Sequence, residues 1–167
     1  MSNSGPVIQY PYERLELASN LSQALISGLG SIGFAVTGEA HDAAIEAVVF
    51  AASSASRKNP EVLGDASAET TLESISETSA RVNGKERRFM GVSIIDLGRI
   101  NYKEEREKPD LRELVLYLHN NGRHLSRIAL ATVIAVPQEY FPMYQKLSWY
   151  ANLAKYVTYF TESDETS

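Results

Sequence analysis

The chain has 167 residues, no cysteine, and a formal net charge of −5 from 16 Lys and Arg against 21 Asp and Glu. The lack of cysteine excludes a disulfide scaffold, cysteine-ligated zinc or iron–sulfur sites, and thiol catalysis. No apolar run approaches the ~20 residues that span a bilayer. The N-terminus has no basic region followed by an apolar stretch, so we expect no signal peptide, a cytoplasmic protein and no membrane partner. The mild acidity argues weakly against non-specific binding to nucleic acid.

The first part of the chain alternates strand and helix signals. Leucines spaced by four predict one helix, which ends at Gly28 and Gly30 as helices commonly do. An alanine-rich run predicts a second helix that packs closely on a sheet. The expected elements are, in order, a strand at 7–10, a helix at 13–29, a strand at 32–36, a helix at 43–56 and a loop at 59–71.

A hairpin is expected next. Asn83-Gly84 is the dipeptide preferred in two-residue type I′ turns, where both positions need positive φ. The polar-alternating run at 72–82 and the apolar run at 89–97 flank this turn and predict two antiparallel strands. The resulting order of elements over residues 1–103 is β-α-β-α-β-β.

The charged segment 103–110 predicts a boundary between a domain at 1–103 and a C-terminal extension at 104–167. The elements expected in the extension are a helix at 110–119, a buried strand at 128–136 and a last helix through Phe160. A buried helix remains the alternative for 128–136, because periodicity cannot separate the two. The aromatic stripe of the last helix predicts packing on the domain, on a second subunit or on a protein partner, with nucleobase stacking as the alternative.

Three stretches between residues 21 and 98 resemble a known family. They read LSQALISGLGSIG, GFAVTGEAHDAAIEAVVFAASSAS and ARVNGKERRFMGVSIIDLG. Their order and spacing resemble the Alba-like superfamily, and within it they are most similar to the bacterial stage V sporulation protein S family. The resemblance implies an α/β, Alba-like β-α-β-α-β-β two-layer sandwich with a C-terminal αβα extension. It also implies a homodimer or higher oligomer that binds DNA or RNA.

The resemblance further implies which side chains meet phosphate. The hairpin would project as an arm, and residues 81–88 hold four cations and one anion. The expected contacts are Arg81, Lys85, Arg87 and Arg88, with Arg14 in support near the first strand–helix junction. That junction lacks the Lys- and Arg-rich patch of archaeal Alba proteins. Without the resemblance, a solvated hairpin tip whose charges prevent edge-to-edge pairing is the simpler interpretation.

The other candidate sites in the sequence give weaker support for a function. Gly28-Leu29-Gly30-Ser31-Ile32-Gly33 matches the letters of the dinucleotide fingerprint, but a helix precedes it and a strand follows, which inverts the required order. His41 near the start of a helix predicts a structural role, and His119 and His124 predict loop residues rather than metal ligands.

No catalytic residue, metal site or cofactor is therefore expected. The leading function is non-enzymatic nucleic-acid binding through the basic hairpin arm. The alternative is a structural or protein-interaction module that assembles with itself or with a partner and does not bind nucleic acid.

Overall fold

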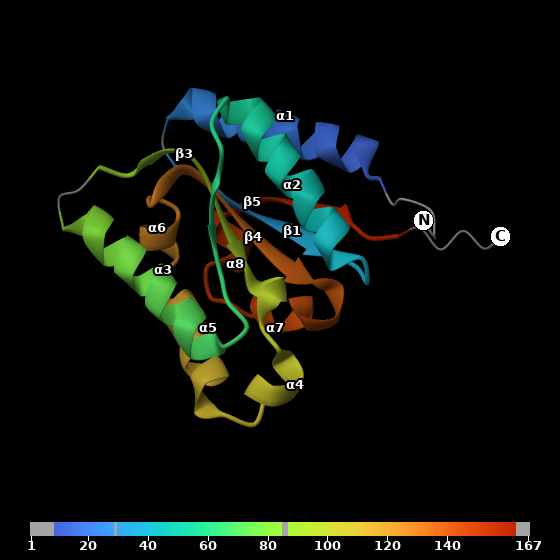
Figure 1. Ribbon diagram of the computed structural model, residues 1–167. Coiled ribbons are helices and arrows are strands. Elements are labelled where there is room, and N and C mark those ends of the chain that lie inside the picture. The colour runs from blue at the N-terminus through green and yellow to red at the C-terminus, as the bar shows by residue number, and fades with distance from the viewer. Residues whose placement is uncertain (1–8, 29, 85–86, 163–167) are drawn as a thin grey trace.

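The computed structural model describes residues 9–28, 30–84 and 87–162, and these form an α/β fold around one five-stranded sheet (Figure 1). The strands are β1 (Ile32–Thr37), β2 (Glu61–Leu63), β3 (Phe89–Asp96), β4 (Ala129–Pro137) and β5 (Ala154–Phe160). Their order across the sheet is β2-β3-β4-β1-β5, and all four pairings are parallel. Parallel neighbours need crossover connections, so helical segments cover both faces.

The helices divide into two layers. The first layer holds α1 (Pro11–Ser27) and α2 (His41–Ser56), which pack together on one face. The second layer covers the other face with α3 (Ala68–Asn83), α4 (Tyr102–Glu105), α5 (Pro109–Asn120), α6 (Gly122–Leu125), α7 (Phe141–Gln145) and α8 (Tyr150–Leu153). Short 3₁₀ turns follow β3 at Leu97–Arg99 and β4 at Gln138–Tyr140.

Alternate residues of the central strands fill two separate cores. In β1, Phe34 and Val36 lie in the core beneath α3 and α5, whereas Ala35 lies in the core beneath α1 and α2. The second core is rich in alanine, including Ala44 and Ala51 of α2, and these small side chains let α2 lie close to the sheet. All six residues of β1 are buried, as expected of a central strand covered on both faces.

The expected Alba-like sandwich is wrong, and so is the antiparallel hairpin on which it depended. The Alba fold has antiparallel strands, whereas this sheet is entirely parallel. Residues 72–82 lie in α3, a helix, and β3 pairs in parallel with β2 and β4. Nor is there a separate αβα extension, because β4 lies between β1 and β3 and β5 lies on the other side of β1.

Local chemistry explains why α3 is a helix. The Ser67 side chain accepts a hydrogen bond from the Thr70 N–H at 3.1 Å, which caps the first turn. Buried positions recur every three or four residues, but several hold threonine or serine, so the apolar periodicity is weak in the sequence. The Thr78 hydroxyl donates to the Ser74 carbonyl at 2.9 Å, which satisfies a polar group within the helix.

The last expected helix is also wrong. Residues 141–153 hold only the short helices α7 and α8, and residues 154–160 are β5. Over the described residues, the helix at 13–29, the strand at 32–36 and the helix at 43–56 are confirmed as α1, β1 and α2, and Gly28 ends α1 with φ 67°. Leu29 lies outside the described residues. The strand at 89–97, the helix at 110–119 and the strand at 128–136 are confirmed as β3, α5 and β4.

Two remaining expectations concern the first residues and the loop at 59–71. Of the strand expected at 7–10, residues 7 and 8 lie outside the described part, and Gln9 and Tyr10 are not in a strand. The loop contains the short strand β2 and the beginning of α3. None of the described helices combines the length and apolarity needed to cross a bilayer.

Candidate functional site

The two edges of the parallel sheet differ in charge, although Arg99 adds an exposed cation to the carboxyl edge directly after β3. Ligands of open α/β sheets usually lie beyond the carboxyl ends of the strands. At that edge, beside the ends of β1, β4 and β5, lies a cavity of about 720 Å³. Its lining includes the carboxylates of Glu39, Glu139 and Glu162 and no described Lys or Arg. This cavity therefore disfavours an anionic ligand.

The amino terminus of α2, which borders this cavity, already holds an anion from the same chain. Glu162 Oε1 accepts a hydrogen bond from the Ala40 N–H at 2.9 Å and faces the Tyr10 hydroxyl at 3.4 Å. The Ala40 N–H is the main cause of a lowered pKa for the Glu162 carboxyl. One backbone N–H at this helix start, that of the N-cap residue Ala40, thus meets Glu162 instead of a ligand.

His41 lies at the same edge between two polar side chains. Its Nδ1 is 2.6 Å from Thr37 Oγ1 and its Nε2 is 2.8 Å from Asp96 Oδ1. One tautomer satisfies both contacts, with Nε2–H donating to the carboxylate and Nδ1 accepting from the hydroxyl. Asp96 Oδ1 also accepts the Gly98 N–H at 3.0 Å.

This hydroxyl–imidazole–carboxylate order is that of nucleophilic hydrolases. Thr37, however, is completely buried, and its hydroxyl is already paired with His41. The cluster instead joins β1, α2 and β3. Sequence reasoning identified His41 but missed Thr37 and Asp96, although an aspartate that ends an apolar strand was a usable signal.

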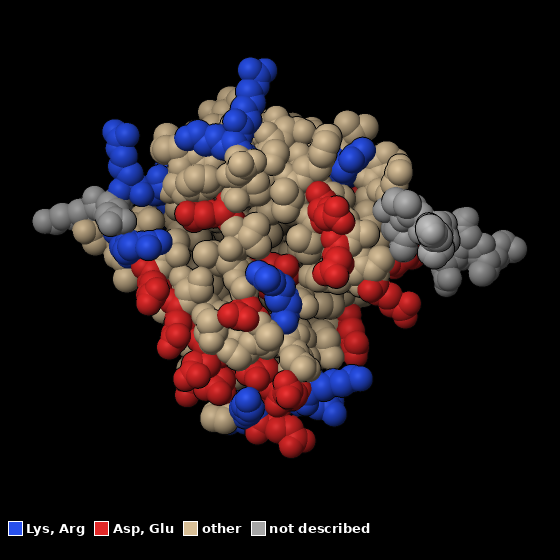
Figure 2. All heavy atoms as spheres, in the orientation of Figure 1, with Lys and Arg blue, Asp and Glu red and all other residues tan. Residues whose placement is uncertain are grey.

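The opposite edge, where the strands begin, is basic. Seven cations lie in the loops before β2, β3 and β4, at the end of α3 and in α6. We call this surface the basic edge, and its cations are Arg57, Lys58, Arg81, Arg87, Arg88, Arg123 and Arg127. Apart from Arg88, which is half-buried, they are exposed. The loops at 57–60, 84–88 and 126–128 hold a single acidic residue, Glu86, which lies with Lys85 outside the described residues. In Figure 2 blue gathers at the top and upper left, over the ends of α2 and α3, whereas the lower half shows many red side chains together with a second group of blue ones at the bottom.

Contacts between the loops hold the basic edge together. The Arg88 guanidinium donates from Nη2 to the Gly28 carbonyl at 2.7 Å, which ties the loop before β3 to the end of α1. Gly30 lies so close to Ser126 that an added Cβ would be 2.5 Å from its carbonyl oxygen and 3.5 Å from Arg88 Nη1. Three loops distant in sequence therefore form one surface.

The residues expected to contact phosphate lie in different places. Arg81, Arg87 and Arg88 are at the basic edge, but on a helix end and a loop rather than on a hairpin arm. Lys85 lies outside the described residues. Arg14 is in α1, where its guanidinium carbon lies 4.5 Å from the centre of the Phe50 ring.

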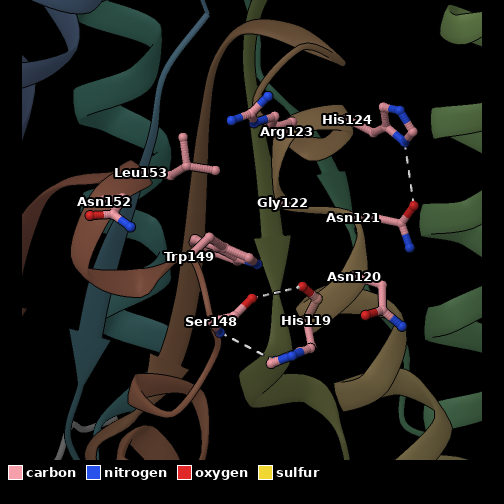
Figure 3. A pocket seen from close by; sticks show the side chains of 10 residues that line it. All are labelled: His119, Asn120, Asn121, Gly122, Arg123, His124, Ser148, Trp149, Asn152 and Leu153. Atoms are coloured by element: carbon pink, nitrogen blue, oxygen red, sulfur yellow. Dashed lines mark hydrogen bonds between the residues drawn. The ribbon is translucent and has the colours of Figure 1, made fainter.

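Beside Arg123 lies a cleft of about 410 Å³ between the end of α5, α6 and the start of α8 (Figure 3). Its polar lining includes His119, Asn120, Asn121, Arg123, His124 and Asn152. Trp149 forms part of its wall and is fixed by a 2.7 Å hydrogen bond from its Nε1–H to the Leu118 carbonyl. No Asp or Glu occurs among the described residues that line this cleft.

The rings of His119 and His124 make contacts within the chain. Within residues 9–28, 30–84 and 87–162, no cluster of three or more His, Asp or Glu side chains is placed to hold a metal ion. His119 Nδ1 accepts the Ser148 N–H at 3.2 Å, and His124 Nδ1 is 3.3 Å from Asn121 Oδ1. Both rings thus stabilise the walls of the cleft.

Comparison with known proteins gives one informative similarity. No protein-family model matches the sequence, and a search of curated proteins finds no match. The structure is similar to that of the ORC2 protein from Aeropyrum pernix, described as ADPNP–ADP complexes, with a TM-score of 0.53 and 10% sequence identity. The similarity covers 96% of this chain and 50% of that one, so this chain spans half the length of the ORC2 chain.

At this identity the similarity shows the fold alone. A five-stranded, all-parallel sheet with helices on both faces is the architecture of Rossmann-like and AAA+ domains. The Alba-like assignment, including the similarity to sporulation protein S, is therefore wrong.

Proposed function

We propose that the protein binds nucleic acid without catalysing a reaction, and that the basic edge is the contact surface. The observation that supports this most directly is the collection of cations from three separate segments, 57–58, 81–88 and 123–127, at one edge of the sheet. Arg and Lys at such a surface neutralise phosphates and release counterions, which favours binding to any sequence. The surface replaces the expected hairpin arm, which is absent, while retaining Arg81, Arg87 and Arg88.

The net charge of −5 is compatible with this proposal because the negative charge is concentrated elsewhere. The carboxyl edge carries Glu39, Glu139 and Glu162 around its cavity. Repulsion from that edge would orient the protein with its basic edge towards a polyanion. Nucleic acid would then bind only at the basic edge, and its affinity would fall strongly as the salt concentration rises.

A nucleoside polyphosphate, the kind of ligand named in the description of the ORC2 structure, does not fit the carboxyl edge of this chain. Only Gly38, Glu39 and Ala40 connect β1 to α2, and no lysine is among them. The Glu162 carboxylate takes the Ala40 N–H that a phosphate oxygen would need. We therefore assign this edge no nucleotide chemistry, and no enzymatic activity is proposed.

A salt-titrated binding experiment tests the proposal. Fluorescence anisotropy would be measured with labelled single-stranded DNA, RNA and duplex DNA of about 20 units, longer than the ~4–16 nucleotides that a small domain covers. The double variant Arg57→Ala/Lys58→Ala should weaken binding to all three. It should also reduce the slope of log K against log[salt] by about 1 for each of the two cations that touches a phosphate.

The matched control removes two exposed cations from the other end of the molecule. Lys103→Ala/Arg112→Ala lowers the net charge by the same amount, in α4 and near the start of α5. The proposal is wrong if both double variants weaken binding equally, or if the unaltered protein binds none of the three probes at low salt. The second result would favour a protein-interaction module, and light scattering would then measure the self-assembly that the sequence also predicts.

A further inference from the structure

The cleft beside the basic edge has the size and lining of a small-ligand site. Its volume of about 410 Å³ falls within the ~300–1,000 Å³ range of ligand pockets. Figure 3 shows Arg123 at one end of the cleft, His119 and Asn120 at the other, and Trp149 between them. Cationic, amide and imidazole groups from two segments far apart in sequence thus surround one space.

Several of these groups are available to a ligand. The side chains of Asn120, Arg123 and Asn152 have no hydrogen-bond or ion-pair partner anywhere in the described chain. Because His119 Nδ1 accepts the Ser148 N–H, the neutral ring carries its proton on Nε2, which has no described partner. The cleft therefore offers a guanidinium for an anion, and amides that both donate and accept.

The walls of the cleft are held in place before any ligand arrives. Trp149 is buried, hydrogen-bonded to the Leu118 carbonyl and stacked at 6.0 Å on Phe34. Gly122 touches the indole so closely that any Cβ would collide with Trp149 Cδ1. A cleft that needs no rearrangement loses little affinity to ordering its own groups.

We propose that this cleft holds a single nucleotide of a bound strand, with the phosphate at Arg123 and the base at the amides of Asn120 and Asn152. This inference rests on the proposed nucleic-acid function and specifies its substrate as single-stranded. Arg123 belongs to both the cleft and the basic edge, so a nucleic-acid strand bound on that edge can place one of its nucleotides in the cleft. Amide side chains suit a nucleobase, whose exposed edge presents both donors and acceptors. A base held in a duplex cannot enter the cleft without leaving the stack.

The chain has one tryptophan, Trp149, so its fluorescence reports on this cleft directly. The protein would be titrated with adenosine 5′-monophosphate, adenosine and inorganic phosphate. The monophosphate should change the fluorescence saturably in the millimolar range. The nucleoside and phosphate should each bind about tenfold more weakly, because each makes only part of the contacts.

A matched pair of variants locates the effect. Asn152→Asp places a carboxylate in the cleft at an exposed position of α8, and Asn59→Asp makes the same change at an exposed position of the basic edge. Asn152→Asp should weaken monophosphate binding about tenfold and weaken single-stranded but not duplex binding. Asn59→Asp should leave the monophosphate titration unchanged.

Each result distinguishes the two proposals. If oligonucleotides bind but the monophosphate leaves Trp149 fluorescence unchanged up to ~10 mM, the cleft inference is wrong and the nucleic-acid function stands. Equal monophosphate binding by the unaltered protein and Asn152→Asp also overturns it, because the ligand then binds elsewhere. If the monophosphate binds at the cleft but no oligonucleotide binds at low salt, the proposed function is wrong and the cleft is a site for free nucleotides. If neither ligand binds, both proposals are wrong.

Discussion

The Nε2 atom of His41 lies 2.8 Å from Oδ1 of Asp96, which joins the first turn of α2 to the last residue of β3. Both partners of the imidazole, Thr37 and Asp96, are buried. The ring therefore satisfies two polar groups that water cannot reach. This makes His41 a structural link between three elements at the carboxyl edge.

His41→Ala should lower the free energy of unfolding by about 1–3 kcal/mol, because it leaves the buried Thr37 hydroxyl without its partner and the Asp96 carboxylate with only the Gly98 N–H. Urea denaturation would measure the change. His124→Ala is the matched control, since His124 is exposed and its only described polar contact is at 3.3 Å. The control should shift stability by less than about 0.5 kcal/mol. Equal effects of the two substitutions would contradict a structural role for His41.

Gly98 tests the same link from the other side of the ring. A Cβ at Gly98 would collide with Cε1 and Nε2 of His41. Because Gly98 does not have positive φ, this collision rather than backbone strain would cause the effect of a substitution. Gly98→Ala should destabilise the protein by about 1–3 kcal/mol through overpacking. In the His41→Ala background the added methyl group fits the vacated space, so the second substitution should have a much smaller effect. Additive effects in this double-mutant cycle would mean that Gly98 and His41 do not interact.

Glu105 predicts a specific dependence of stability on pH. Its buried carboxylate accepts the Ala68 N–H at 2.9 Å and lies 3.3 Å from Lys108 Nζ. The Ala68 N–H, and to a lesser extent Lys108, lowers the pKa of Glu105 below its ordinary value of 4.5. A lowered folded-state pKa stabilises the protein above the unfolded-state pKa, and this contribution is lost as the pH falls through the folded-state value.

Glu105→Gln should therefore reduce stability near neutral pH, and the difference from the unaltered protein should shrink on acidification below about pH 4.5. Denaturation curves collected across that range would measure this convergence. Glu107→Gln is the control, because Glu107 is exposed and its side chain has no described partner. A difference between Glu105→Gln and the unaltered protein that stays constant with pH would argue against the ionised carboxylate as its source.

Local patterns in the sequence are enough to predict those elements whose periodicity is apolar. The leucine spacing of α1 and the alanine-rich face of α2 correspond to residues that are buried in the structure. In α3 the buried positions include Thr71 and Thr78, whose hydroxyls bond to backbone carbonyls of the preceding turn. Such positions are polar in the sequence, so the pattern of this helix resembles that of a strand.

The topology depends on contacts that no local pattern contains. The sequence of a single apolar strand such as β4 is the same whether its neighbours run parallel or antiparallel. The strand β4 lies between β3 and β1, although β1 ends at Thr37 and β4 begins only at Ala129. The candidate sites are hidden from the sequence for the same reason. His41 and Asp96 are 55 residues apart, and Arg88 and Gly28 are 60 apart.

Arg88 allows the structural and electrostatic roles of the basic edge to be separated. Its half-buried guanidinium donates to the Gly28 carbonyl at 2.7 Å while adding a positive charge to the surface. Arg88→Ala removes both, and should lower stability by about 1 kcal/mol and weaken polyanion binding. Arg88→Lys keeps the charge but replaces a planar fork with a flexible ammonium, so it should recover much of the binding and little of the stability.

Unfolding and anisotropy measured on the same two variants would show whether these roles separate. If Arg88→Lys binds as poorly as Arg88→Ala, the guanidinium acts by holding the loops in position rather than by contacting phosphate. If both variants bind like the unaltered protein, Arg88 is not part of the contact surface. The first result would assign the phosphate contacts to the exposed cations on either side of Arg88, and the second would restrict Arg88 to its contact with Gly28.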